Sequence, residues 1–362
     1  MPEETAQTQA TAKAPAPVRV LVVDDSAFMR FAITQQLNED PGLQVIGSAS
    51  NGNEALKLIP QLQPDVVTMD VEMPHLDGLA TLREVMKNFP RPVIMFSSLT
   101  KEGAAETIQA LMLGAVDFIP KPENRLDIRA AMNEMTSKIK VAARARVKQE
   151  VARLAPAAPA VVYTEKPVRG YNKSTPLVFI GSSTGGPGAL NEIIPALPAN
   201  LPSPVLIVQH MPAGFTRSLA DRLNAISALR VKEAESGDAL SVGQVLIAPG
   251  GYHMVLDEND RITLNQKPTV HGVRPAVDVT LNSLVQRLGK NIIAVILTGM
   301  GSDGALGASL LRSTGGYVIA EHESTCVVWG MPRSVVEAGA ASAVLPRQKI
   351  ARAIESQIKE MR

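Results

Sequence analysis

The sequence predicts an α/β protein made of two doubly wound parallel-sheet domains. Three observations favour this fold class. Short apolar runs alternate with segments whose apolar residues recur at helical spacing. The alternation stops once, in a proline-containing stretch near the middle of the chain, and then starts again. Polar residues gather where the apolar runs end, which is where sheets of this kind bind their ligands.

The first domain is expected over residues 18–140. Its strands are almost wholly apolar, which predicts a parallel sheet with helices on both faces. After the last strand, a helix is predicted to begin near Glu123 and to run into the basic stretch 142–153. The five predicted strands lie at residues 18–25, 43–50, 64–70, 92–98 and 115–122.

Two segments are predicted to lie outside the folded domains. Residues 1–17 are polar and rich in Ala, Thr and Pro, which predicts a disordered tail rather than a secretion signal. Residues 141–175 include the run LAPAAPAVVYTEKPVRGYNKSTP, which has prolines and no apolar periodicity. That composition is typical of a linker.

The second domain is expected over residues 176–362, where the alternation restarts. Two segments at 252–258 and 261–266 flank Asn259 and Asp260, and they predict a β-hairpin inserted into this domain. The predicted strands of the sheet lie at residues 177–181, 204–209, 244–250, 291–299 and 316–321.

The composition argues against several classes of function. Aromatic residues make up 3% of the chain, too few for platforms that stack single-stranded nucleic acid, and the net charge of +1 indicates no polyanionic partner. No apolar run is long enough to span a bilayer, so no membrane insertion is expected. The single cysteine, Cys326, fits a reducing compartment, and the cytoplasm is the expected location.

Charged and polar side chains gather at the strand ends of the first domain. The first strand ends in Asp24 and Asp25, the third in Asp70, the fourth in Ser97 and the fifth in Lys121. Converging carboxylates repel one another unless a cation lies between them, and Mg²⁺ is the usual cation where phosphate is handled. A hydroxyl and a lysine nearby would hold the oxygens of a phosphoryl group. Each aspartate alone would be better explained as a cap, but the whole set predicts a site.

The motifs around these residues, DDSAFMR, MDVEMPHLDG, FSS and Lys121-Pro122, resemble a response-regulator receiver domain. The resemblance implies a flavodoxin-like fold in which Asp70 accepts a phosphoryl group from a histidine kinase. The family's switch aromatic falls at Phe118, which lacks the hydroxyl of the tyrosine often found there. The resemblance further implies the Mg²⁺ ligands Asp25, Asp70 and the backbone carbonyl of Glu72, with Asp24 nearby, and the phosphoryl sensors Ser97 and Lys121.

The second domain opens on the glycine-rich turn IGSSTGG, residues 180–186, between a strand and a helix. Such turns either cradle a phosphate or present a nucleophilic serine. The phosphate role is the weaker one, because the turn lacks a Gly-Lys-Ser/Thr ending and the second glycine of G-x-G-x-x-G. The pattern G-x-S-x-G is satisfied with Ser183 at its centre.

Neighbouring strand ends supply the other groups that nucleophilic acyl chemistry needs. The hydroxyls of residues 182–184, the imidazole of His210 and the carboxylate of Asp303 are predicted to converge on one edge of the sheet. A serine needs a base to take its proton, and the base needs a carboxylate to fix its tautomer. No H-E-x-x-H motif or paired-histidine spacing is present, which disfavours metal catalysis at this site.

Other residues compete for these roles. Asp303 could instead be the N-cap of a helix that starts near Gly304, and Asp278 is a rival carboxylate that is better explained as opening a helix. His253 lies in the predicted hairpin and is expected to be structural, whereas the loops around two other histidines make them harder to dismiss. The four rivals of His210 are His75, His253, His271 and His322.

The motifs IGSSTGG, VQHMPAGFT, IAPGGYHM, HGVRPAVDVT and ILTGMGSDGA together resemble the catalytic domain of chemotaxis protein-glutamate methylesterases. The resemblance extends from about Leu177 to the C-terminus and implies a Rossmann-like domain whose esterase reaction needs no cofactor. Ser182 stands where the family often has a small residue, so its hydroxyl is not the attacking one. The implied roles are nucleophile for Ser183, base for His210, orienting carboxylate for Asp303, backbone oxyanion donors near Met300 and Gly301, and Thr184 close to the nucleophile.

Together the two resemblances imply a phosphorylation-activated serine hydrolase of the chemotaxis pathway. Its substrates would be glutamate methyl esters, and certain glutamines, on chemotaxis receptors. Its phosphodonor would be a chemotaxis histidine kinase, and Mg²⁺ would be needed for receiver phosphorylation alone. Two other classes stay open: a dinucleotide-dependent oxidoreductase, which the missing fingerprint disfavours, and a response regulator that acts only by binding DNA or protein.

Overall fold

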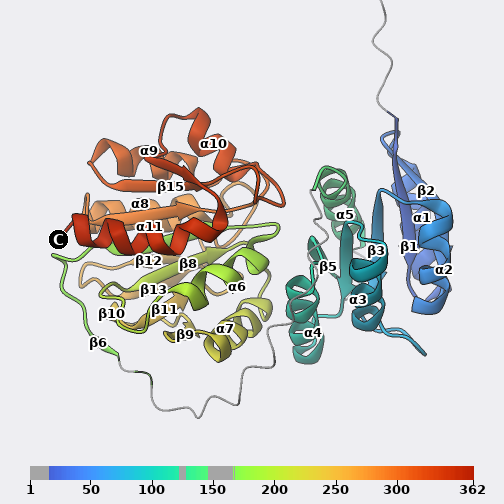
Figure 1. Cartoon of the computed structure of the whole chain (residues 1–362), viewed down its shortest axis with the longest axis horizontal. Helices are drawn as coiled ribbons and strands as arrows, with labels where there is room; N and C mark the ends of the chain where they lie inside the picture. The colour runs from blue at the N-terminus through green and yellow to red at the C-terminus, as the bar shows by residue number, and fades with distance from the viewer. Residues whose placement is uncertain (1–15, 122–127, 146–165, 167) are drawn as a thin grey trace, which may run out of the picture.

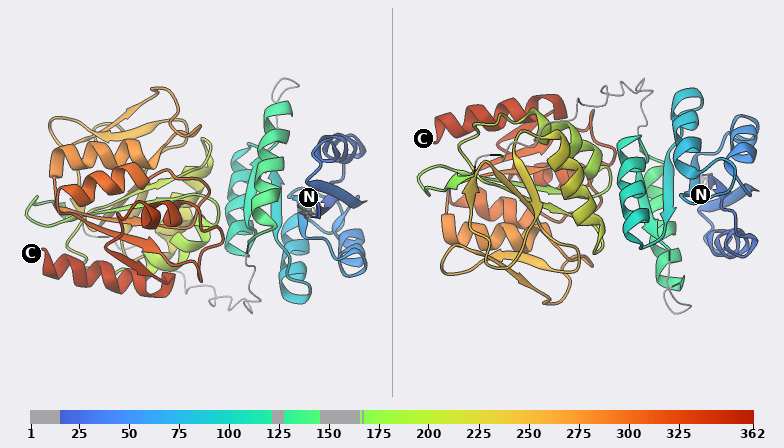
Figure 2. Two further views of the ribbon diagram at one scale, coloured as in Figure 1. Left: turned by 90° about the horizontal axis from the view of Figure 1, so that it is seen from above. Right: turned by 90° about the horizontal axis from the view of Figure 1, so that it is seen from below.

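The computed structural model describes residues 16–121, 128–145, 166 and 168–362. Nearly all of the predicted tail, most of the predicted linker and the expected helix start near Glu123 lie outside the described residues. The described chain forms two sheet-based domains that lie side by side (Figure 1, Figure 2). The predicted domain boundaries at residues 140 and 176 stay predictions.

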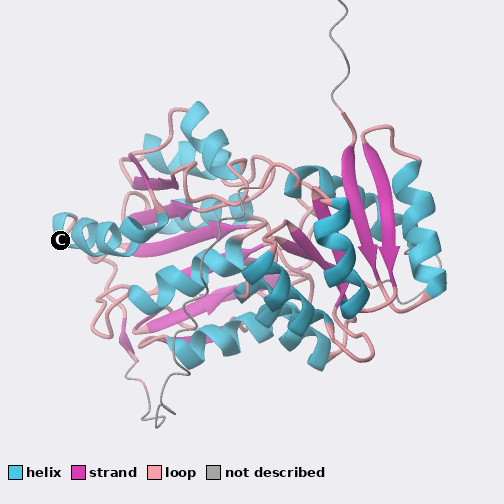
Figure 3. Ribbon diagram, turned by 45° about the vertical axis from the view of Figure 1, so that its right-hand side comes forward, coloured by secondary structure: helices cyan, strands magenta, loops and turns pink. Residues whose placement is uncertain are grey.

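The first domain contains a parallel five-stranded sheet in the order β2-β1-β3-β4-β5, which confirms the predicted fold class. Helices cover both faces of the sheet (Figure 3). Helices α1 and α5 pack on one face, and α2, α3 and α4 pack on the other. The strands are β1 Val18–Val23, β2 Leu43–Ala49, β3 Val66–Asp70, β4 Val93–Ser97 and β5 Asp117–Pro120; the helices are α1 Ala27–Asn38, α2 Gly52–Leu62, α3 Gly78–Asn88, α4 Lys101–Met112 and α5 Ile128–Ala142.

Side-chain caps set where most of these helices begin. Ser26, Asn51, Asp77 and Thr100 each accept a hydrogen bond from a backbone N–H in the first turn of the helix that follows. The helices therefore start directly after the strand-end loops. As a result, the loops at the carboxyl ends of β1, β3 and β4 are short and hold their polar residues close to the sheet.

The second domain contains a parallel seven-stranded sheet in the order β16-β15-β14-β7-β8-β11-β9. Helices α6, α7 and α11 pack on one face, and α8, α9 and α10 pack on the other. The strands are β7 Leu177–Ser182, β8 Val205–Gln209, β9 Arg230–Glu233, β11 Gln244–Ile247, β14 Ile292–Ile296, β15 Tyr317–Glu321 and β16 Ala343–Leu345; the helices are α6 Gly186–Ala196, α7 Phe215–Ile226, α8 Val277–Leu288, α9 Ala305–Ser313, α10 Met331–Glu337 and α11 Arg347–Glu360.

The predicted hairpin is confirmed, because β12 His253–Leu256 pairs antiparallel with β13 Ile262–Asn265. The sequence did not predict the two edge strands, β9 and β16, which are only four and three residues long and partly exposed. It also did not predict that β6 Arg169–Gly170 pairs with β10 Ser241–Val242, and β6 falls within the expected linker. A two-residue exposed strand has no periodicity to detect.

The two domains meet through α4 and β5 of the first and the carboxyl edge of the second sheet. The ring of Phe118 on β5 lies against the ring of Phe215 at the start of α7, with centroids 4.4 Å apart. The side chain of Val327, from the loop after β15, packs against the apolar cluster between β1, α1 and α5. Helix α4 contacts both α6 and α7. Among the described helices, none is long and apolar enough to cross a bilayer.

Candidate functional sites

The predicted carboxylate cluster forms at the strand ends of the first domain. Oxygen atoms of Asp24, Asp25 and Asp70 lie within 4.8 Å of one another. Asp24 and Asp70 are buried, and Oδ2 of Asp24 has no hydrogen-bond partner among the described residues. A buried carboxylate oxygen without a partner is costly unless a cation coordinates it. The residues present therefore fit a hard divalent cation with oxygen ligands, as a receiver domain requires for phosphorylation.

Asp70 is the innermost carboxylate of this cluster. Its Oδ2 accepts a hydrogen bond from Lys121 Nζ at 2.6 Å, and its Oδ1 accepts one from the backbone N–H of Glu72 at 3.2 Å. Burial raises the pKa of Asp70 to about 6, although Lys121 favours the charged form. Burial also raises the pKa of Asp24. Burial thus disfavours the ionised form of these carboxyls, and a bound cation would stabilise that form.

The Ser97 hydroxyl makes no hydrogen bond to Asp70 in this arrangement. Its hydroxyl donates to the carbonyl of Gly103 at 3.1 Å and accepts from the hydroxyl of Thr107 at 2.6 Å, so it is held against α4. The expected role of Ser97 as a phosphoryl sensor therefore requires its hydroxyl to move. Phe118, the predicted switch aromatic, is buried between the domains. Phe118 lies on β5, the strand that leads to Lys121, the hydrogen-bond partner of Asp70.

The two adjacent serines of the turn after β7 differ in their surroundings. Ser182 is fully buried, and its hydroxyl donates to Oε1 of Gln209 at 2.7 Å. Ser183 is half-buried, and its hydroxyl makes no hydrogen bond to the rest of the described chain. Its backbone N–H donates to the carbonyl of Thr298 at 3.1 Å. Of the two hydroxyls, the one on Ser183 is available for chemistry.

The structure brings His210 and Asp303 together. Nε2 of His210 lies 2.8 Å from Oδ2 of Asp303, so Nδ1 is the ring nitrogen left to take a proton. The backbone N–H of His210 donates to the carbonyl of Ser182 at 3.0 Å, which places the imidazole beside the serine turn. The ring and the hydroxyl of Ser183 thus border the same edge of the sheet.

Asp303 caps a helix, but not the helix that follows it. Its two oxygens accept hydrogen bonds from the backbone N–H groups of Val277 and Asp278 at 2.6 and 2.8 Å, at the start of α8. Burial raises the pKa of Asp303, but the hydrogen bond and charge of His210 and these two N–H groups outweigh it, so the net shift is downward. Asp303 therefore stays ionised beside His210.

Gln209 belongs to the site although it was not predicted as a site residue. Its amide Nε2 donates to the carbonyl of Ser183 at 2.9 Å and to the carbonyl of His210 at 3.2 Å, while its oxygen binds Ser182. One side chain therefore ties the serine turn to the histidine loop. Its place at the end of β8, next to His210, was the signal that could have indicated this role.

The loop after β14 approaches the serine turn from the other side. A Cβ atom on Gly299 would lie 2.8 Å from Cβ of Ser183, so only glycine fits there. Gly301 has a φ of +81°, and Met300 is exposed at the edge of the site. Thr184 is buried, and its hydroxyl donates to Oδ2 of Asp117 in the first domain at 2.5 Å.

The rival residues take other roles. Asp278 opens α8, where its Oδ1 accepts from the N–H of Gly307, and its Oδ2 lies 2.9 Å from Nε2 of His271. His253 is buried, with Nδ1 accepting from the N–H of Ala276 and Nε2 close to a carbonyl. Among the described residues, His271 is the only one of the four within ion-pair distance of Asp303, with Nε2 3.8 Å from Oδ1.

Models of known protein families match both domains. A family model described as CheB methylesterase matches residues 178–354, and one described as response regulator receiver domain matches residues 20–133. The chain is 54% identical to the protein-glutamate methylesterase/protein-glutamine glutaminase of Symbiobacterium thermophilum, over 95% of this chain and 98% of that protein. It is 46% identical to the protein of the same name from Archaeoglobus fulgidus, over 93% of this chain and 97% of that protein.

A solved structure, the catalytic domain of the Thermotoga maritima CheB methylesterase, is also similar. It is 50% identical in sequence, with a TM-score of 0.49, and the match covers 51% of this chain and 98% of that chain.

Proposed function

The chain belongs to the family of CheB methylesterases that carry a response-regulator receiver domain, and on that basis we propose that it is a phosphorylation-activated protein-glutamate methylesterase and protein-glutamine glutaminase. Its substrates are methylated glutamates, and certain glutamines, on chemotaxis receptors. The observation that carries this proposal is the unbonded Ser183 hydroxyl beside the His210–Asp303 pair.

In the proposed reaction, Ser183 Oγ attacks the γ-carbonyl carbon of the methylated glutamate while Nδ1 of His210 takes the hydroxyl proton. Asp303 accepts the Nε2 proton of His210 in a hydrogen bond and stabilises the imidazolium. The proton then passes to the leaving methoxide oxygen, and methanol departs. Water, activated by the same imidazole, attacks the acyl-enzyme and releases the glutamate side chain. A glutamine substrate would follow the same route and release ammonia.

The oxyanion formed in each attack needs preorganised donors. We assign this role to backbone N–H groups near Met300 and Gly301, because Gly299 holds their loop against Ser183. Loss of one such donor typically lowers the rate by roughly 10²–10³. Thr184 lies next to the nucleophile with its hydroxyl engaged by the first domain.

For the receiver, we assign Asp70 as the residue phosphorylated by a chemotaxis histidine kinase. Asp25, Asp70 and the backbone carbonyl of Glu72 would hold Mg²⁺, with Asp24 nearby, and the ion would neutralise charge on the transferred phosphoryl group. Lys121 already contacts Asp70, and Ser97 would turn from Thr107 towards the phosphoryl oxygens. The interface at Asp117 and Phe118 supports regulation, since it covers the catalytic edge.

The nucleophile is tested by replacing each serine of the turn. Methanol release from methylated receptor membranes should be abolished by Ser183→Ala and retained in large part by Ser182→Ala, the matched control. Survival of methanol release in Ser183→Ala would exclude Ser183 as the nucleophile.

The regulation is tested with a small phosphodonor and Mg²⁺. Wild-type protein should release methanol faster when the phosphodonor is added, whereas Asp70→Ala should keep its basal rate without stimulation. Stimulation that is unchanged in Asp70→Ala would contradict the regulatory role of this residue.

A further inference from the structure

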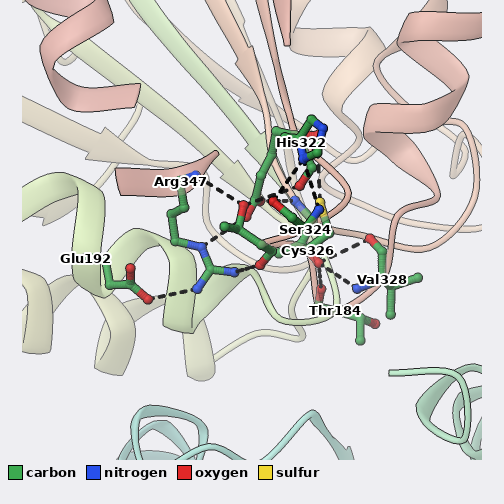
Figure 4. Close-up of polar contacts among 10 residues, drawn as sticks. Thr184, Glu192, His322, Ser324, Cys326, Val328 and Arg347 are labelled. Carbon is green, nitrogen blue, oxygen red and sulfur yellow. Dashed lines mark hydrogen bonds and ion pairs between the residues drawn. The ribbon is translucent and has the colours of Figure 1, made fainter. Parts of the chain in front are cut away.

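A buried ion pair joins Glu321 and Arg347 outside the proposed triad. Figure 4 shows Arg347 with Glu192, and Thr184 and Val328 nearby. Glu321, the last residue of β15, is fully buried, and its Oε1 accepts a hydrogen bond from Nε of Arg347 at 3.0 Å. Arg347 is the first residue of α11, and its side chain is 11% exposed. Burial alone would lower the pKa of Arg347, but Glu321 and Glu192 outweigh it and raise this pKa, so the guanidinium is charged.

The second oxygen of Glu321 holds the residue on which the serine turn rests. Oε2 accepts the backbone N–H of Thr298 at 2.8 Å. The carbonyl of Thr298 accepts the N–H of Ser183 at 3.1 Å. The hydroxyl of Thr298 donates to the carbonyl of Thr184 at 3.0 Å. Val328 donates its N–H to the same hydroxyl at 3.0 Å. Every polar group of Thr298 therefore connects Glu321 to the turn or to the loop beside it.

The other end of Arg347 reaches the helix that follows the serine turn. Its Nη1 donates to Oε1 of Glu192 on α6 at 2.8 Å, and its Nη2 donates to the carbonyl of Thr325 at 2.5 Å. One guanidinium thus joins α6, which continues from the turn, to the carboxylate that holds Thr298. The planar fork of arginine makes these contacts at once, which the single ammonium of lysine does not.

Buried ion pairs are weak contributors to stability, because desolvation offsets most of their attraction. A role in stability alone therefore explains this pair poorly. Catalysis, by contrast, is sensitive to the position of the nucleophile, and a displacement of about 1 Å can lower the rate roughly 100-fold.

We propose that Glu321 and Arg347 are positioning residues for the esterase reaction. They fix Thr298, so that Ser183 and the backbone donors near Met300 keep their relative geometry. The inference rests on the proposed function, since it assumes that Ser183 is the nucleophile.

Glu321→Gln in the full-length protein tests the pair, because Thr298 and Arg347 donate to different oxygens of the carboxylate and an amide keeps only one of these two acceptors. The kcat for methanol release should fall about 10-fold to 100-fold, with KM within about twofold of wild type. Adding Arg347→Gln gives the new amide N–H at position 321 an acceptor and frees its oxygen for Thr298. The double variant should therefore recover much of the lost kcat, a rescue that general destabilisation would not produce.

Glu235→Gln is the matched control, because it removes a carboxylate from an exposed ion pair with Lys232 in the same domain. It should leave kcat and KM unchanged. Should Glu321→Gln fail to fold, Arg347→Lys keeps the charge without the fork and should still lower kcat several-fold. A wild-type kcat in Glu321→Gln or in Arg347→Lys, or a change in KM alone, would overturn the proposal. A double variant with a lower kcat than Glu321→Gln and Arg347→Gln alone would also overturn it.

Hydrogen exchange separates this inference from the proposed function. The Thr298 amide should exchange faster in Glu321→Gln than in Glu235→Gln, whatever the substrate. A wild-type protein that releases no methanol would contradict the proposed function, and the exchange rates would then decide whether the pair holds Thr298. Equal exchange in both variants would overturn that role.

Discussion

At the scale of single residues, Asp303 joins two tasks in one carboxylate. It binds Nε2 of His210 and also caps α8 through the N–H groups of Val277 and Asp278. The cap fixes the carboxylate before any substrate binds, and the carboxylate in turn fixes the tautomer of the histidine. The same residue that sequence reasoning weighed as either a triad member or a cap is therefore placed to act as both.

This double contact makes Asp303→Asn informative. The amide oxygen can still accept one backbone N–H, so the fold should be kept, but the amide group can present a donor to His210 and favour the wrong tautomer. We expect kcat for methanol release to fall by roughly 10²–10⁴ and the melting temperature to change little. A mutant with near-wild-type kcat would show that His210 does not depend on Asp303.

Asp70 predicts a pH dependence of stability in the metal-free protein. Its native pKa of about 6 lies above its ordinary value of 3.8, so the native state prefers the neutral carboxyl. The contribution of the neutral Asp70 carboxyl to the free energy of unfolding is fully present below about pH 4 and is lost as the pH rises through 6. Asp70→Asn should therefore raise the free energy of unfolding by roughly 3 kcal/mol at pH 7.5, and this gain should vanish towards pH 4.

Urea unfolding in EDTA at several pH values measures this gain. Adding Mg²⁺ should then stabilise the wild type and narrow its difference from Asp70→Asn, because the cation binds the charged cluster. A gain that is independent of pH, or untouched by Mg²⁺, would contradict this account of the cluster.

At the scale of secondary-structure elements, the loop after β14 and the turn after β7 pack backbone against backbone. Gly299 is the closest approach between them: its missing Cβ would lie 2.3 Å from Sδ of Met331 and 2.8 Å from Cβ of Ser183. β14 is the strand next to β7 at the point where the order of the sheet reverses, so both loops lie at the edge of the sheet where such folds bind their ligands.

Gly299→Ala should therefore displace the loop or the nucleophile. We expect kcat to fall at least 100-fold, in line with the sensitivity of catalysis to misplacement by about 1 Å. Gly170→Ala is the control, since a Cβ there meets nothing within 4 Å, and it should leave kcat unchanged. Equal activity of the two variants would mean that the loop adapts without effect on the site.

Much of this arrangement could be predicted from the sequence, because apolar strands followed by polar residues mark the carboxyl edge of a parallel sheet. Asp70, His210 and Asp303 were predicted as site residues in that way, and the structure brings His210 and Asp303 together. The contacts of Gln209 and Glu321 were not, because each depends on which strands are neighbours, and strand order is not written in local periodicity. The edge strands β9 and β16 were missed since short, partly exposed strands carry little apolar signal.

At the scale of the whole molecule, one polar chain crosses between the domains. Lys138 on α5 contacts Asp117 at 3.2 Å, and Asp117 in turn accepts the hydroxyl of Thr184, the residue after Ser183, at 2.5 Å. Beside it, the ring of Phe118 lies against Phe215 and under Nζ of Lys138. Because β5 carries both contacts, a shift of this strand would release the catalytic edge at two points together.

We therefore expect Asp117→Ala to raise the methanol release of the unphosphorylated protein. One hydrogen bond is worth about 1 kcal/mol, so the ratio of closed to open molecules should fall roughly fivefold and the basal rate should rise by up to that factor. The rate with phosphodonor should stay the same, so the stimulation ratio falls. Asp40→Ala is the control. It removes a carboxylate that pairs with Lys140, which lies on α5 like Lys138, but this ion pair is away from the domain interface. If both variants keep the wild-type basal rate, the bond between Asp117 and Thr184 does not hold the domains closed.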